Sequence, residues 1–134
     1  MMVLRIYAQI LGLVLILVGL LGLVLGERVW LGVLNVDLFE DIVHLVTGGL
    51  LAFVGFSERG GEYARSVVGG LGVIYLLFGL LGFVVPTVFG LLPHGYSVFD
   101  NLLHLALGVA SIAVVFYSQA GRTAGRHGPR MARR

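Results

Sequence analysis

The chain has 134 residues, of which 58% are apolar and only 12% are charged, and it contains no cysteine. Its mean hydropathy of +1.01 excludes an ordinary water-soluble domain and indicates a protein that lies in a membrane. Without cysteine the chain has no disulfide, no thiolate metal site and no thiol nucleophile.

Four apolar stretches are long enough to cross a hydrocarbon core about 30 Å thick as helices, at a rise of about 1.5 Å per residue. They cover residues 5–25, 38–56, 64–85 and 98–117. We therefore predict an all-α integral membrane protein, a four-helix bundle formed by residues 1–118. The connections 26–36 and 86–96 are apolar but too short to span, so we expect them to fold over one end of the bundle or lie in the interface.

The sequence repeats itself at an offset of sixty residues, so that residues 5–57 correspond to residues 65–117. The matching positions include several glycines, which in lipid allow helices to pack closely. Each repeat holds two spans, and the two repeats therefore share one orientation about an axis along the membrane normal. We predict helix packing at Gly12, Gly19, Gly22, Gly48, Gly72, Gly79, Gly82 and Gly108.

The basic residues are all arginine, and in a four-span arrangement only Arg28 falls on the side opposite the others. The positive-inside rule then places both termini in the cytoplasm of a multi-pass plasma (inner) membrane protein. Residues 119–134 are rich in arginine and glycine, so we expect a disordered cytoplasmic tail that binds anionic lipids. Because ordinary membrane anchoring accounts for this charge, we expect no nucleic-acid partner.

The second and fourth spans begin with sequences typical of a capping box, in which an N-cap side chain and an acid three residues later satisfy free backbone N–H groups. In the second span these residues are Asp37 and Glu40, and in the fourth they are Ser97 and Asp100. Carboxylates at these positions are also favoured by the helix dipole. We therefore interpret all four residues as helix caps.

His44 and His104 are the ionisable groups that lie well inside the spans, each about 10 Å along its helix. Such a residue is a candidate functional site because its burial in lipid is unfavourable. The first interpretation is a neutral, hydrogen-bonded imidazole, paired with the acid one turn earlier (Glu40 or Asp100) or with a partner helix. This pairing would lock the second and fourth spans together.

Three other interpretations remain open. His44 and His104 could ligate one haem between the helices. They could instead form a divalent-metal site with Glu40 and Asp100, with Asp41 as a further candidate ligand. A stripe of polar side chains could also line a path for protons or a small solute; it comprises Asp41, His44, Thr47, His104 and Ser111.

The segment FDNLLHLALGV, residues 99–109, resembles the signature of a family of small four-span bacterial membrane proteins known as domain of unknown function four-three-eight-three. The shared pattern is Asn-x-x-His-Leu-x-x-Gly, carried here by Asn101, His104, Leu105 and Gly108. The second span departs from it with Asp41 in place of the asparagine. The resemblance implies a four-helix membrane fold and supplies no activity.

The sequence contains no nucleophile–base pair and no glycine-rich phosphate loop, so we expect no enzyme. We predict a non-catalytic structural or accessory subunit of a membrane assembly, with the lipid bilayer and other membrane subunits or a second copy as partners. No cofactor is expected on this interpretation. The alternatives are a protein whose His44 and His104 bind haem or a metal, and a small-solute or proton transporter.

Overall fold

The computed structural model describes residues 2–126, which form four long helices joined by short connections. Each helix is long and apolar enough to cross a membrane. The helices α1 and α2 are joined by a hairpin of two short strands, whereas single-turn 3-10 helices lie in the other two connections. The elements are α1 (Met2–Leu25), β1 (Arg28–Trp30), β2 (Leu34–Val36), α2 (Leu38–Phe56), η1 (Gly60–Glu62), α3 (Ala64–Val84), η2 (Val88–Gly90) and α4 (Val98–Arg126).

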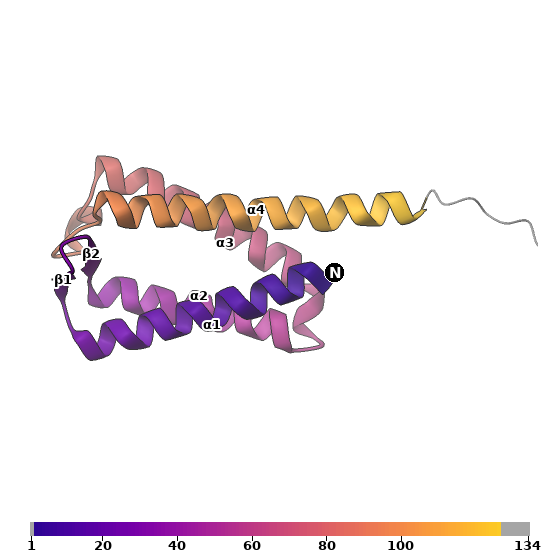
Figure 1. The fold of residues 1–134 in the computed structure, drawn as a ribbon, viewed down its shortest axis with the longest axis horizontal. Helices are drawn as coiled ribbons and strands as arrows, with labels where there is room; N and C mark the ends of the chain where they lie inside the picture. Colours follow the sequence, from indigo (N-terminus) through magenta and orange to yellow (C-terminus); the bar gives the residue numbers. More distant parts are fainter. Residues whose placement is uncertain (1, 127–134) are drawn as a thin grey trace, which may run out of the picture.

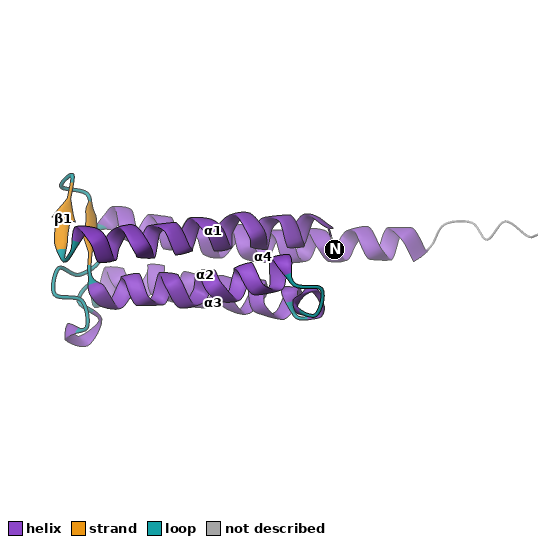
Figure 2. Ribbon diagram, turned by 90° about the horizontal axis from the view of Figure 1, so that it is seen from below, coloured by secondary structure: helices purple, strands orange, loops and turns teal. Residues whose placement is uncertain are grey.

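The four helices run along one long axis, with the β1–β2 hairpin and η2 at one end (Figures 1 and 2). We call this the hairpin end. The start of α1 and the turn η1 lie at the opposite end. Most contacts between helices are made within the pairs α1–α2 and α3–α4, and fewer are made between the pairs. We call the region where the two pairs meet the seam.

Glycines bring the two helices of each pair close together. All eight glycines predicted to mediate packing are buried. At Gly12 an added Cβ would lie 2.6 Å from the backbone nitrogen of Ala52, and at Gly108 it would lie 2.6 Å from the Leu76 side chain. Near the hairpin end, Gly22 leaves room for the Asp41 side chain and Gly82 leaves room for that of Asn101. Positions sixty residues apart therefore make corresponding contacts in the two pairs.

The two connections at the hairpin end differ although their positions in the sequence correspond. The first connection forms two antiparallel strands, with Val29 opposite Asn35. Its turn has positive φ angles at Leu31 and Gly32. The second connection buries Val88, Leu92 and Tyr96 in a small apolar cluster against Phe39. This cluster packs against the first turn of α2.

Helix α4 is longer than the sequence led us to expect. We predicted disorder from residue 119, but the helix continues to Arg126. The reason is that glutamine, alanine and arginine favour a helix and that no proline occurs between the start of α4 and Pro129. The rest of the predicted tail, residues 127–134, lies outside the described part of the chain.

Two neighbouring glycines of α2 offer a matched test of the packing within a pair. A Cβ at Gly48 would lie 2.8 Å from the backbone nitrogen of Ile16, whereas a Cβ at Gly49 would meet no atom within 4 Å. We expect Gly48→Ala to lower the free energy of unfolding by roughly 1–3 kcal/mol through overpacking. Gly49→Ala should leave it unchanged or slightly raised, since alanine favours a helix more than glycine does. Unfolding in mixed detergent micelles measures both, and equal losses would contradict the packing.

Candidate functional site

Polar side chains of α2 point into the seam. Glu40, His44 and Thr47 are three or four residues apart, so they share one face of the helix, and Asp37, directly before α2, continues this row. All four are buried. Helix α4 contributes the buried side chains of Asp100, His104 and Ser111, whereas buried Asn101 packs against Gly82 within its own pair. A surface with so many polar groups is unusual between apolar helices, where each buried polar group needs a partner.

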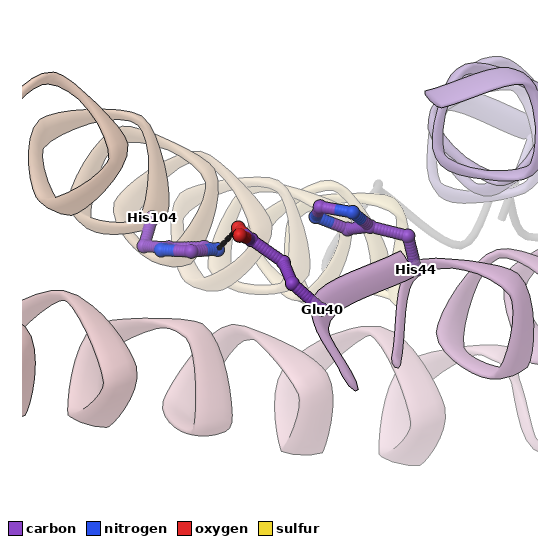
Figure 3. A group of neighbouring side chains, drawn as sticks. All are labelled: Glu40, His44 and His104. Atoms are coloured by element: carbon purple, nitrogen blue, oxygen red, sulfur yellow. Dashed lines mark ion pairs between the residues drawn. The ribbon is translucent and has the colours of Figure 1, made fainter. Parts of the chain in front are cut away.

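Glu40, His44 and His104 converge at the seam. Each offers one ligand atom, and the three atoms lie within 4.8 Å of one another. Figure 3 shows the Glu40 carboxylate between the two imidazole rings, whose centroids are 6.3 Å apart. Glu40 Oε1 lies 3.6 Å from His104 Nε2, which is longer than a hydrogen bond. Glu40, His44 and His104 expose only 7%, 9% and 4% of their surfaces, respectively. We call them the Glu–His–His cluster.

The pairing of acids with histidines differs from the intrahelical pairing considered above. Glu40 forms its ion pair with His104 of the other pair of helices, although its carboxylate lies between both imidazole rings. Asp100 is not part of the cluster, because its carboxylate accepts hydrogen bonds from the backbone N–H groups of Ser97 (2.8 Å) and Asn35 (3.3 Å). Asp100 therefore does not join the metal ligand set in which the sequence placed it.

Only one of the two expected capping boxes forms. At α4 the Asp100 backbone N–H donates to Ser97 Oγ at 3.1 Å, and Asp100 accepts from Ser97 in return. At α2 the expectation was wrong, because Asp37 makes no side-chain cap hydrogen bond. Its Oδ1 instead lies 2.8 Å from His94 Nδ1, and the longer side chain of Glu40 reaches into the seam. Glu40 is therefore available as a ligand.

Several buried polar atoms of this region have no hydrogen-bond partner within the described residues. They include Glu40 Oε2, the Nδ1 atoms of His44 and His104, and Asp37 Oδ2. Each such atom costs roughly 1–3 kcal/mol if it stays unpaired. A purely structural role for the cluster would therefore leave several buried polar atoms without hydrogen bonds.

Aromatic rings surround His104. The ring of Tyr75 stacks on it at 5.5 Å, Phe78 lies at 6.4 Å, and Tyr96 meets it edge-on at 4.9 Å between centroids. Burial raises the pKa of the Tyr96 hydroxyl above its usual range, so this side chain stays a neutral phenol. A haem between the histidines would have to displace these rings as well as Glu40.

Two tyrosine hydroxyls extend the polar seam toward the opposite end. The Thr47 hydroxyl donates to the Val43 carbonyl at 2.7 Å, so Tyr75 donates to Thr47 Oγ1 at 2.8 Å. Tyr7 and Ser111 are likewise hydrogen-bonded at 2.8 Å. The sequence interpretation missed both tyrosines. A tyrosine within a span could have indicated them, because its hydroxyl needs a partner in lipid.

Asp41 is not part of this polar seam, although the sequence placed it in the stripe with His44 and Thr47. Its side chain packs against Gly22 of α1. It also lines a surface pocket of about 150 Å³ next to Gly26 and Leu38. The reason is geometric: residues 40 and 41 are about 100° apart around a helix, so only one of them can face the seam.

The hairpin end joins the two pairs through the first turns of α2 and α4. Asn35 donates its backbone N–H to Asp100 and its side-chain amide to the carbonyls of Gly95 and His94. In the same region Ser97 Oγ donates to the Val33 carbonyl at 2.6 Å. His94, which the sequence interpretation also missed, contacts Asp37. Each connection thus contacts the helix start of the other pair.

No family model matches the chain, and no curated protein or solved structure matches it either. The resemblance carried by Asn101, His104, Leu105 and Gly108 stays a prediction.

The Tyr75–Thr47 contact can be tested with the ring in place. We expect Tyr75→Phe to lower the free energy of unfolding in micelles by about 0.5–1.5 kcal/mol through loss of one buried hydrogen bond. Its ring remains stacked on His104. Tyr63→Phe removes an exposed hydroxyl and should change stability by less than about 0.5 kcal/mol. Equal effects of the two variants would show that the Tyr75 hydroxyl contributes nothing to the seam.

Proposed function

We propose that the chain is a multi-pass protein of the plasma (inner) membrane, built from two tandem two-helix repeats with both termini in the cytoplasm. Large apolar side chains are exposed along all four helices, as a lipid environment requires. The hairpin end carries the acids Glu27, Asp37 and Asp100, whereas most arginines belong to the other end. This distribution favours a cytoplasmic location for the end that holds η1.

We further propose that Glu40, His44 and His104 bind a divalent transition metal between the two repeats. The observation that carries this proposal is the convergence of one carboxylate and two imidazoles, with ligand atoms within 4.8 Å of one another. Two nitrogens and one oxygen form a ligand set that suits zinc or ferrous iron. In a tetrahedral zinc site neighbouring ligand atoms lie about 3.3 Å apart, so side-chain rotations that close the cluster by about 1.5 Å would complete the site.

Metal binding accounts for features of the cluster that hydrogen bonding between its side chains leaves unexplained. The Glu40–His104 distance of 3.6 Å is too long for a hydrogen bond, yet it is close to the separation of two ligands on one metal. Among the described residues, Glu40 Oε2 and His44 Nδ1 are also buried without a hydrogen-bond partner, and both can bind a cation in the cluster. A cation would neutralise the carboxylate, which is otherwise unfavourable in a low-dielectric region.

Binding is favoured over catalysis and over haem ligation. Tyr75, Phe78 and Tyr96 pack around His104 and leave little room beside the cluster for a substrate or a macrocycle. We therefore propose no enzymatic activity. Association with other membrane subunits, a structural role within an assembly and a path for a solute stay predictions from the sequence.

The proposed orientation can be tested directly because the chain has no native cysteine. Glu27 and Glu58 are both exposed; Glu27 directly precedes β1 at the hairpin end, and Glu58 lies between α2 and η1 at the opposite end. We expect a membrane-impermeant maleimide to label Glu27→Cys in intact spheroplasts. Glu58→Cys should be labelled only after the membrane is permeabilised. The reverse pattern would overturn the proposed orientation.

The metal site can be tested on the purified full chain after treatment with a chelator. We expect cobalt(II) and zinc(II) to bind with one equivalent per chain, as measured by cobalt absorption and by calorimetry. Replacing a direct ligand, as in Glu40→Gln or His104→Ala, should weaken binding by more than the roughly 10–100-fold that loss of an outer-shell partner causes.

Asp41→Asn is the matched control for Glu40→Gln, since the two acids are adjacent but Asp41 faces α1. It should leave metal affinity unchanged. Absence of stoichiometric binding to the native chain would refute the proposed site. A Soret band on protein isolated from membranes would instead support haem.

A further inference from the structure

The Glu–His–His cluster is too deeply buried for a cation to reach it without passing through part of the bundle. None of its three residues exposes more than 9% of its surface. A metal ion must lose its hydration shell as it leaves water, so side chains with oxygen or nitrogen donors are needed along the way. The route can therefore be inferred from where such donors lie.

On the way to the cluster from the end that holds η1, the described core offers hydroxyls that are already hydrogen-bonded, such as those of Tyr7 and Tyr75, and no carboxylate or imidazole. Its interior is a contiguous apolar cluster in which Leu4, Ala64 and Val68 are fully buried and Leu51 and Val54 are 1% exposed. A divalent cation crossing this layer would exchange its hydration shell for apolar side chains and a few neutral hydroxyls, which is strongly unfavourable.

The hairpin end provides a polar connection between solvent and the cluster. His94 lies in the second connection, and its side chain is 32% exposed. Its Nδ1 lies 2.8 Å from Oδ1 of Asp37, whose side chain is 0% exposed. Asp37 precedes Glu40 by three residues on the same face of α2, which is about 4.5 Å along the helix axis. His94, Asp37 and Glu40 thus form a series from the surface to the cluster.

Asp37 has a carboxylate oxygen that is free to bind a metal ion. Its Oδ2 atom is buried and has no hydrogen-bond partner within the described residues. It is not needed as a cap, because it makes no side-chain hydrogen bond to its own helix. Glu27 and Asp100 lie at the same end with the single basic residue Arg28, and this excess of carboxylates attracts cations to the hairpin end.

We propose that His94 and Asp37 form a transient site through which a divalent transition metal reaches the Glu–His–His cluster from the hairpin end. This inference rests on the proposed metal site. The cation binds first to the imidazole of His94, replaces its contact with the Asp37 carboxylate, and passes from Asp37 to Glu40 one helical turn further along α2. The transient site acts on the rates of binding and release and leaves the final ligands unchanged.

Stopped-flow measurement of cobalt(II) binding to the purified full chain tests this route. His94→Gln retains a side chain that can hydrogen-bond to Asp37 but is a poor metal ligand. We expect it to lower the association and dissociation rates together by about 10-fold or more, which corresponds to a barrier higher by about 1.4 kcal/mol. The equilibrium affinity should stay within about 2-fold, since direct ligands are intact.

Thr87→Ala, an exposed change in the same connection, serves as the control and should leave both rates unchanged. If the native chain binds cobalt but His94→Gln binds at the native rate or faster, the route is refuted and the metal site stands. If the native chain binds no cobalt, the metal site itself has failed.

A second measurement needs no substitution. In proteoliposomes of uniform orientation, cobalt added on the hairpin side should bind faster than cobalt added on the opposite side. Equal rates, or faster binding from the opposite side, would overturn the route.

Discussion

The close approach of helix backbones across glycine is the constraint on which the rest of this bundle depends. In lipid there is little hydrophobic drive between helices, so their association relies on tight packing. Gly12 and Gly48 provide it between α1 and α2, and Gly72 and Gly108 provide it between α3 and α4. Because each pair is closed by such contacts, the polar side chains are left at the seam. The position of the Glu–His–His cluster follows from that division.

The helices and their glycine contacts could be predicted largely from the sequence. Helix α2 has the predicted bounds 38–56, and the other helices begin or end within a few residues of their predicted limits except at the C-terminal end of α4. Hydropathy and glycine spacing are local signals, so they locate spans and close contacts without knowledge of the partner helix. The extension of α4 to Arg126 was missed because arginine and glycine suggest a tail, although arginine is also a good helix former.

The details of the site depended on contacts that no local pattern encodes. The spacing of Glu40 and His44 is compatible with an intrahelical pair, yet Glu40 faces His104 in the other pair of helices. The sequence predicts a capping side chain at Asp37, but the Asp37 carboxylate instead contacts His94, which lies 57 residues away in the second connection. The roles of Tyr7 and Tyr75 likewise depend on Ser111 and Thr47 of other helices. Tertiary packing decides which of these contacts form.

The difference between Glu40 and Asp100, which occupy corresponding positions sixty residues apart, has a consequence for symmetry. Two identical halves can supply donor atoms only in even numbers, whereas the cluster has three. The shorter aspartate remains bonded to the start of its own helix, and the glutamate, longer by one methylene, reaches between the imidazoles. A single methylene thus makes the centre of the bundle chemically one-sided, although the two helix pairs make corresponding glycine contacts. That one-sidedness requires two different halves, which a single chain supplies, because a homodimer of either half would offer both carboxylates or neither.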